Sequence, residues 1–346
     1  MRKIINLRSD TVSKMSQSMI KALSEAQVGD DVYGDDPTLN RLQDHFASMF
    51  GKEKGLLTLS GTMSNLISIL VHCERGDAAL LTKSSHINVY EQGNISSIAG
   101  VFPIVIPENP DGTINFEDAK SNIMPENQHF ARTKLLCLEN TQNLLSGRAL
   151  PLSFNSELLN FKSKFPINTH LDGSRLLNAY FFHKEKNPSL KVESLTAGFD
   201  SVSMCLSKGL RCPLGSILVG SEEFINKAHR WRKALGGGFR QAGYFAAAAF
   251  QSLSEAEEVI KQDHLNSKTL ASEFKKRGLK VEQSDTNMIV FNPHVDGSSA
   301  EYIKRLEKVG ILANTRMDGK VRFVFHENIK EEDVEDVVKR MFSKEF

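Results

Sequence analysis

The chain has 346 residues, of which 40% are hydrophobic and 25% charged, the balance of a globular protein that can bury a large core. Its net charge of +1 excludes a global electrostatic attraction to nucleic acid or to an anionic membrane. The length predicts two domains, or one large domain with a smaller appendage. We therefore expect a soluble protein with neither a nucleic acid nor a membrane as partner.

The cysteines are few and lie within apolar segments, at Cys73, Cys137, Cys205 and Cys212. None has the C-x-x-C spacing of a zinc ribbon, so no structural metal is expected. The basic N-terminus lacks the apolar stretch of a secretory signal, and no apolar run approaches bilayer-spanning length. Sparse thiols of this kind are typical of reduced core residues, which predicts a cytoplasmic protein.

Short apolar runs alternate with helical patterns along the first two thirds of the chain. The first clear helix is predicted at 36–51, where Asp36 can cap the helix, Pro37 suits its first turn and Gly51 ends it. Strands are predicted at 55–59, 79–82, 101–106, 134–138, 167–171, 200–206 and 214–219, and further helices after residue 62, at 153–164 and at 174–182. This alternation predicts a mostly parallel sheet covered on both faces, with 214–219 antiparallel to 200–206.

The pattern changes near residue 245. A long helical stretch at 245–277 precedes short strands and two amphipathic helices. The strands are predicted at 279–281, 288–291 and 321–325, and the helices near 299–309 and 330–342. We therefore expect a large α/β domain at 1–245, with an N-terminal arm, and a smaller C-terminal α+β domain at 246–346.

Lys208 ends the apolar run 200–206 and is followed by Gly209. A lysine is costly to bury unless it is paired or used in chemistry. One such use is an imine with an aldehyde cofactor, in which the neutral amine is the nucleophile. A lysine that merely points to water is the commoner reading of a single such residue, so the assignment depends on the residues around it.

Ser60-Gly61-Thr62 lies between a predicted strand and a predicted helix. The N–H groups and the dipole at a helix start favour a phosphate, and Gly61 lets the backbone approach closely. A plain helix cap is the competing interpretation. The segment is neither a Walker loop nor a G-x-G-x-x-G fingerprint, which disfavours a nucleotide.

Two titratable residues follow predicted strands. Asp172 ends 167–171, where a carboxylate beside a pyridine nitrogen would keep that nitrogen protonated. His86 follows 79–82 and could stack on a flat ring and act as a base near neutral pH. The alternatives are a helix cap for Asp172 and a solvated loop for His86. Together with Lys208 and the Gly61 segment, these residues predict a pyridoxal phosphate site.

Three arginines are candidates for binding anions. Arg175 has a planar fork that suits a substrate carboxylate, and Arg322 interrupts an apolar strand and needs a partner there. Arg240 follows the flexible glycines 236–238 and could approach a phosphate or a neighbouring subunit. An ordinary ion pair is the competing interpretation for Arg175 and Arg322, and a solvated hinge is the one for the glycines.

In their joint order and spacing, the motifs of nearly the whole chain resemble the threonine aldolase family of pyridoxal phosphate enzymes of fold type I. The matching strings are LRSDT (7–11), GDDVYGDDPT (29–38), SGT (60–62), His86, ENT (139–141), DGSR (172–175), LSKGL (206–210), RK (232–233) and RQ (240–241). The resemblance implies an aminotransferase-like fold, with a mostly parallel seven-stranded sheet and a smaller C-terminal domain. It also implies a homotetramer, a dimer of dimers whose active sites lie at subunit interfaces.

The resemblance implies a role for each site residue. Lys208 would hold the cofactor as an imine, Asp172 would pair with the pyridine nitrogen, and His86 would stack on the ring. Gly61, Thr62 and Arg240 would contact the cofactor, while Ser9, Arg175, Arg322, Tyr33 and Gln142 would contact the substrate. Tyr33 and Arg240 would come from a neighbouring subunit. The implied reaction is cleavage of L-threonine, L-allo-threonine and related β-hydroxy-α-amino acids to glycine and an aldehyde.

Gln142 departs from the family pattern, which often has histidine after ENT. A glutamine amide can bind the substrate's hydroxyl but is no useful base at neutral pH. His86, directly or through a water, would then carry more of the proton transfer. Three alternatives stay open: a β-eliminating lyase or dehydratase, an aminotransferase, and a non-catalytic cofactor-binding homologue. Gln142 favours the first and the third.

Overall fold

The computed structural model describes residues 3–293, 298–343 and 346, and its centre is a seven-stranded sheet. In pairing order the strands are β2 (Lys54–Thr58), β8 (Ser216–Gly220), β7 (Ser201–Cys205), β6 (Asn168–Asp172), β5 (Thr133–Glu139), β3 (Ala78–Thr82) and β4 (Phe102–Ile106). Neighbours from β7 to β4 are parallel, whereas β8 is antiparallel to both β7 and β2. The predicted mostly parallel sheet is therefore confirmed.

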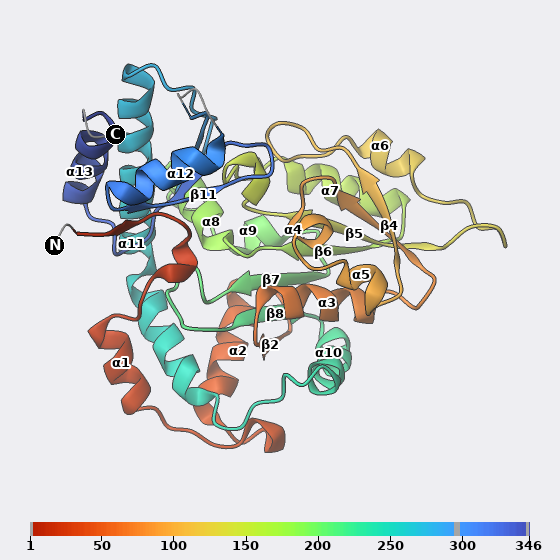
Figure 1. Cartoon of the computed structure of the whole chain (residues 1–346). Helices are drawn as coiled ribbons and strands as arrows, with labels where there is room; N and C mark the ends of the chain where they lie inside the picture. The colour runs from red at the N-terminus through yellow and green to blue at the C-terminus, as the bar shows by residue number, and fades with distance from the viewer. Residues whose placement is uncertain (1–2, 294–297, 344–345) are drawn as a thin grey trace.

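Helices cover both faces of this sheet because alternate strand side chains point to opposite sides. Leu80 and Ile217 pack in one apolar cluster, while their neighbours Leu81 and Leu218 pack on the other face. The first face is covered by α2 (Pro37–Met49), α7 (Phe154–Lys164) and α8 (Leu176–Lys184), and the second by α3 (Gly61–His72) and α10 (Glu222–Ala234). Figure 1 shows the sheet between α7 and α8 on one side and α3 and α10 on the other.

Shorter elements join these layers. They are α1 (Gln17–Ser24), α4 (His86–Val89), α5 (Asn94–Ser97), α6 (Phe116–Ser121), α9 (Glu193–Thr196) and the 3-10 turns η1 (Asp10–Val12), η2 (Asp31–Tyr33) and η3 (Asn143–Leu145). Local sequence also sets the two ends of the longer helix α2. Asp36 caps α2 by accepting a hydrogen bond from the N–H of Leu39, and Gly51 has the positive φ that ends the helix.

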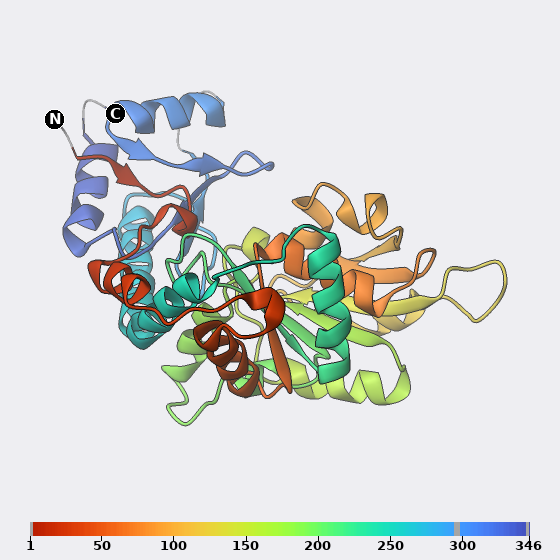
Figure 2. The ribbon, with the colours of Figure 1, turned by 90° about the horizontal axis from the view of Figure 1, so that it is seen from below.

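The C-terminal elements that follow the long helix α11 (Gly243–Lys276) gather at one end of the molecule, and α11 leads into them (Figure 2). They are β9 (Met288–Phe291), α12 (Ser299–Lys308), β10 (Ile311–Leu312), β11 (Asn314–Thr315), β12 (Val321–Val324) and α13 (Glu331–Met341). β9, β12 and β11 form an antiparallel sheet, and β10 pairs in parallel with the N-terminal strand β1 (Ile5–Asn6). The N-terminal segment thus joins the smaller unit, since Ile5 and Leu7 lie in its core.

One predicted strand, 279–281, is wrong. The N–H of Leu279 donates to the carbonyl of Phe274 and closes the end of α11, so it is not available for a ladder. Val281 then makes a single bridge to Phe291. The N–H of Glu282 donates to the carbonyl of Val290 at 2.8 Å, so the segment stays beside β9 without forming a strand of its own.

α11 connects the two units. Its Ala246 and Ile260 lie in the core of the large sheet, whereas Leu270 and Phe274 lie in the core of the small one. The division near residue 245 stays a prediction. Within the described residues, no helix has both the length and the apolar character needed to cross a membrane.

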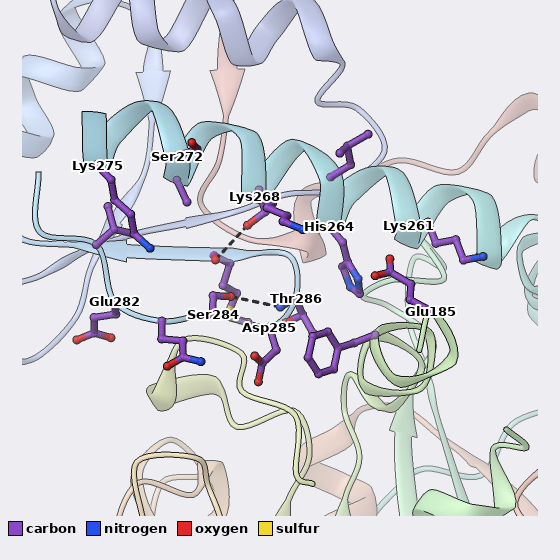
Figure 3. Close-up of a pocket in the computed structure, with 17 residues that line it drawn as sticks. Glu185, Lys261, His264, Lys268, Ser272, Lys275, Glu282, Ser284, Asp285 and Thr286 are labelled. Atoms are coloured by element: carbon purple, nitrogen blue, oxygen red, sulfur yellow. Dashed lines mark hydrogen bonds between the residues drawn. The ribbon is translucent and has the colours of Figure 1, made fainter. Parts of the chain in front are cut away.

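A pocket of about 420 Å³ lies where α11 meets the segment 281–286 (Figure 3). Two of its acidic side chains are engaged in ion pairs: Asp285 contacts Arg148 at 3.2 Å, and Glu282 contacts Lys320. No residue predicted for the functional site lines this pocket. Several of the predicted residues line a different pocket, at the carboxyl ends of the parallel strands.

Candidate active site

A second pocket, of about 450 Å³, gathers most of the predicted chemistry. Five of the predicted residues line it: Ser9, His86, Arg175, Lys208 and Arg322. They are accompanied by Thr11, Tyr90, Asn143, Asn314, Thr315 and Arg316. The pocket is therefore built from the N-terminal segment, the ends of the large sheet and strand β12.

Lys208 stands on the turn between β7 and β8. β7 ends at Cys205, and the N–H of Arg211 donates to the carbonyl of Lys208 at 2.8 Å. The turn directs the lysine to the edge of the sheet where ligands bind in open α/β folds.

Asp172 is the last residue of β6 and is buried. Its Oδ1 accepts hydrogen bonds from the N–H and hydroxyl of Ser174, and its Oδ2 accepts from Asn65 at 2.9 Å. Burial alone would raise the pKa of Asp172, but the positive charges of His86 and Lys208 and these hydrogen bonds lower it below its usual value. A buried carboxylate that stays ionised is suited to hold a cation.

His86 begins α4 directly after the turn that follows β3. Its Nδ1 lies 2.8 Å from Oε1 of Glu91, which also accepts a hydrogen bond from Asn65. Burial lowers the pKa of His86, but the hydrogen bond that its Nδ1–H donates to Glu91 and the charge of Asp172 outweigh burial and leave the pKa raised. Ligating atoms of His86, Glu91 and Asp172 lie within 4.8 Å of one another. Asn65 donates to both carboxylates, so we read the group as a hydrogen-bond network.

Glu139, at the end of β5, connects two parts of the site. Its Oε2 accepts from the N–H of His86 at 2.8 Å, and its Oε1 accepts from the N–H of Asn143 at 2.9 Å. Burial and the negative charge of Asp172 raise the pKa of Glu139 to about 7, against the effect of the two N–H donors.

Glu139 is expected to make the stability of the cofactor-free protein depend on pH. The folded chain keeps this proton up to about pH 7, whereas the unfolded chain loses it near pH 4.5, so stability falls as pH rises through this window. The loss is about 3 kcal/mol. Urea unfolding at pH 5 and pH 8 should show a smaller difference in Glu139→Gln than in the wild type. A wild type and variant that respond identically to pH would contradict the assignment.

Two arginines, Arg175 and Arg322, face the pocket and have different hydrogen-bond partners. Arg175 donates hydrogen bonds from Nε and Nη2 to the carboxylate of Asp10, both at 2.7 Å. Burial would raise the pKa of Asp10, but the charge and hydrogen bonds of Arg175 outweigh burial and lower this pKa to about 2. Arg322 donates from Nη1 to the amide oxygen of Asn143 at 2.9 Å. Burial and the charge of Arg175 lower the pKa of Arg322. Two adjacent guanidinium groups make this end of the pocket suited to a carboxylate.

Gly61 is the first residue of α3, and Ser60 caps the helix by accepting from the N–H of Met63. A Cβ at Gly61 would lie 2.8 Å from Sγ of Cys205 and 3.4 Å from Oγ of Ser174. The helix start therefore lies against the ends of β7 and β6, close to Asp172. Thr62 occupies the same first turn, which has the polarity to hold a phosphate.

Gln142 does not line the pocket. Its side chain is buried beside Gly112, and its Oε1 has no hydrogen-bond partner. Its neighbour Asn143 lines the pocket in its place. The substrate contact of Gln142 stays a prediction.

Tyr33 and Arg240 also stand outside the pocket of this chain. Tyr33 is 78% exposed at the end of η2, and Arg240 pairs with Asp30 at 2.9 Å. Their predicted contact across a subunit interface stays a prediction.

The residues present fit pyridoxal phosphate. Lys208 offers the amine, Asp172 an ionised carboxylate for the ring nitrogen, and α3 a helix start for the phosphate. The sequence does not predict five further residues that contribute to this site: Asp10, Asn65, Glu91, Glu139 and Asn143. Asp10 and Glu139 lie inside the strings that carry the resemblance, and Asn65 and Asn143 follow two of these strings within three residues, which is a signal that could have found them.

Comparison with known proteins finds relatives over nearly the whole chain. The model of the beta-eliminating lyase family matches residues 6–295. A low specificity L-threonine aldolase of Escherichia coli is 38% identical, covering 96% of this chain and 97% of its own. A low-specificity L-threonine aldolase of Arabidopsis thaliana is 41% identical, with 95% and 93% covered.

The solved structure of Leishmania major threonine aldolase superposes with a TM-score of 0.79 at 15% identity, over 98% of this chain and 100% of that one. A serine palmitoyltransferase of Sphingomonas wittichii gives 0.77 at 19% identity, over 98% and 86%. Fold and site thus define an aminotransferase-like lyase of fold type I, as predicted. The chain belongs to the beta-eliminating lyase family, among the relatives of the low-specificity L-threonine aldolases.

Proposed function

We propose that this protein is a pyridoxal phosphate-dependent aldolase that cleaves L-threonine, L-allo-threonine and related β-hydroxy-α-amino acids to glycine and an aldehyde. The observation that carries the proposal is a pocket in which Lys208, His86 and the arginines Arg175 and Arg322 face one another. The identity of 38–41% to low-specificity L-threonine aldolases over nearly the whole chain supports the substrate class.

Pyridoxal phosphate, when bound, supplies an electron sink for the carbanion left at the substrate's α-carbon. Asp172 favours a proton on the ring nitrogen because it is a buried, ionised carboxylate. Lys208 would hold the cofactor covalently through its amine, the nucleophile that the pocket offers for this purpose.

The arginines orient the substrate. Asp10 occupies the Nε and Nη2 edge of Arg175, which leaves Nη1 for a substrate carboxylate. Arg322, held by Asn143, is the second donor. Holding the carboxylate at these two donors would fix the direction of the substrate's Cα–Cβ bond in the pocket.

His86 accepts the proton of the substrate's hydroxyl, directly or through a water. Glu91 engages Nδ1, so Nε2 is the nitrogen that can receive this proton. His86 lines the pocket and Gln142 does not, which supports His86 as the base.

Initial rates with L-threonine and L-allo-threonine test the proposal. We expect glycine and acetaldehyde in equal amounts, measured by chromatography and by a coupled dehydrogenase. The family description favours one rival, a β-eliminating lyase or dehydratase, which would give 2-oxobutyrate and ammonia. Those products would exclude an aldolase, and the absence of any product would favour a non-catalytic homologue.

We further propose a cytoplasmic homotetramer, a dimer of dimers. The exposed Tyr33 and Arg240 support an interface across which they reach a neighbouring site, and four free, buried cysteines support a reducing compartment. Light scattering of the purified protein should give four times the chain mass of 38.6 kDa. A monomer would contradict the interface.

A further inference from the structure

Arg211 lies three residues after Lys208 and has no part in the mechanism above. Its side chain is 2% exposed, and its φ of 57° lies in the left-handed region that favours glycine. A conformation of this kind is strained in a residue with a side chain, and it persists only where surrounding contacts hold it.

The backbone of Arg211 closes the turn that presents Lys208. Its N–H donates to the carbonyl of Lys208 at 2.8 Å, and the next N–H, of Cys212, donates to the carbonyl of Leu206 at 3.0 Å. Any displacement of Arg211 would therefore move the backbone of Lys208.

The side chain of Arg211 ties this turn to two other elements. Its Nη2 contacts Glu255 on α11 at 2.7 Å, and its Nη1 contacts Glu327. Glu327 lies three residues after the end of β12, the strand that carries Arg322 into the pocket. One buried guanidinium thus joins the amine end of the pocket to the strand of its carboxylate end.

The ion pair between Arg211 and Glu255 connects the turn to other elements than β12. Glu255 also accepts hydrogen bonds from Ser18 of α1 and from Gln251 of α11, both at 2.7 Å. It therefore anchors Arg211 to the helices beside the pocket and not to β12. The two carboxylates are similarly exposed, at 30% and 26% of their side chains, so each serves as a control for the other.

We propose that Arg211 is a positioning residue that, through Glu327, fixes the distance between Lys208 and Arg322 and so tunes the affinity for the substrate's carboxylate. This inference rests on the proposed function, because it takes Lys208 and Arg322 as the two ends of the substrate site. A merely structural role would lower stability without changing substrate affinity selectively.

The test compares Glu327→Gln with Glu255→Gln in the holoenzyme. Each variant removes one charge next to Arg211 and keeps the shape of the side chain. Glu327→Gln should raise the KM for L-threonine about tenfold, with kcat and cofactor affinity within about twofold of the wild type. Glu255→Gln should leave KM within about twofold, even if urea unfolding shows an equal loss of stability. Arg211→Lys, which keeps the charge without the fork, should raise KM to an intermediate degree.

Glycine binding, followed by the change in the cofactor's visible absorbance, gives a second readout that requires no bond cleavage. Its dissociation constant should rise about tenfold in Glu327→Gln alone. Equal increases in both glutamate variants, or no increase in either, would overturn the positioning role. If the wild type binds glycine but cleaves no threonine, the proposed function fails while the positioning role is still measured.

Discussion

Replacing Lys208 by alanine is expected to lower kcat for L-threonine by about 10⁴-fold and to abolish the visible absorbance of the bound cofactor. The amine of Lys208 is the group in the pocket that can form an imine, and no neighbouring side chain in the described pocket offers a second primary amine. Stopped-flow assays and an absorbance spectrum of the dialysed protein check both effects.

Lys208→Arg is the matched control, since it keeps a positive charge near Asp172 without a nucleophilic amine. We expect it to lose activity and absorbance as fully as alanine does. An arginine variant that keeps the spectrum, or an alanine variant that keeps activity, would refute the assignment of Lys208.

Asp172→Asn should lower kcat about 10³-fold, because an amide cannot hold the ring nitrogen in its protonated state. The fold should persist, since asparagine can still accept the hydrogen bond that Asp172 Oδ1 receives from Ser174. Single-turnover rates of glycine formation measure the effect on the chemical step.

Asp200→Asn provides the matched control for Asp172→Asn. Asp200 precedes β7 at the opposite end of the sheet, where it pairs with Lys162 at 2.7 Å. The Asp200→Asn variant should lose some stability and keep the kcat of the wild type. If both variants slowed the reaction equally, the role of Asp172 would be structural and not electrostatic.

The sequence was sufficient to predict the sheet and the position of the chemistry on it. Strands are short apolar runs that local composition reveals, and Asp172 and Lys208 follow two of them directly. Because carboxyl ends of parallel strands meet at one edge, order along the chain already placed these side chains together.

Contacts between distant segments could not be predicted in this way. Asp10 accepts hydrogen bonds from Arg175, which lies 165 positions away in the sequence. Glu139 accepts a hydrogen bond from the backbone N–H of His86, which lies 53 positions away. Neither pairing leaves a local pattern. The position of the Gln142 side chain depends on the fold of its loop. The strand predicted at 279–281 does not form because the N–H of Leu279 donates to the carbonyl of Phe274 at the end of α11.

The central claim is that this pocket breaks the bond between the α- and β-carbons of threonine. The most direct test is ¹³C NMR of the holoenzyme with L-threonine labelled at both carbons. We predict that the one-bond coupling between the labels disappears, with one label in the α-carbon of glycine and the other in the carbonyl of acetaldehyde. A labelled 2-oxobutyrate that keeps the coupling would contradict the account.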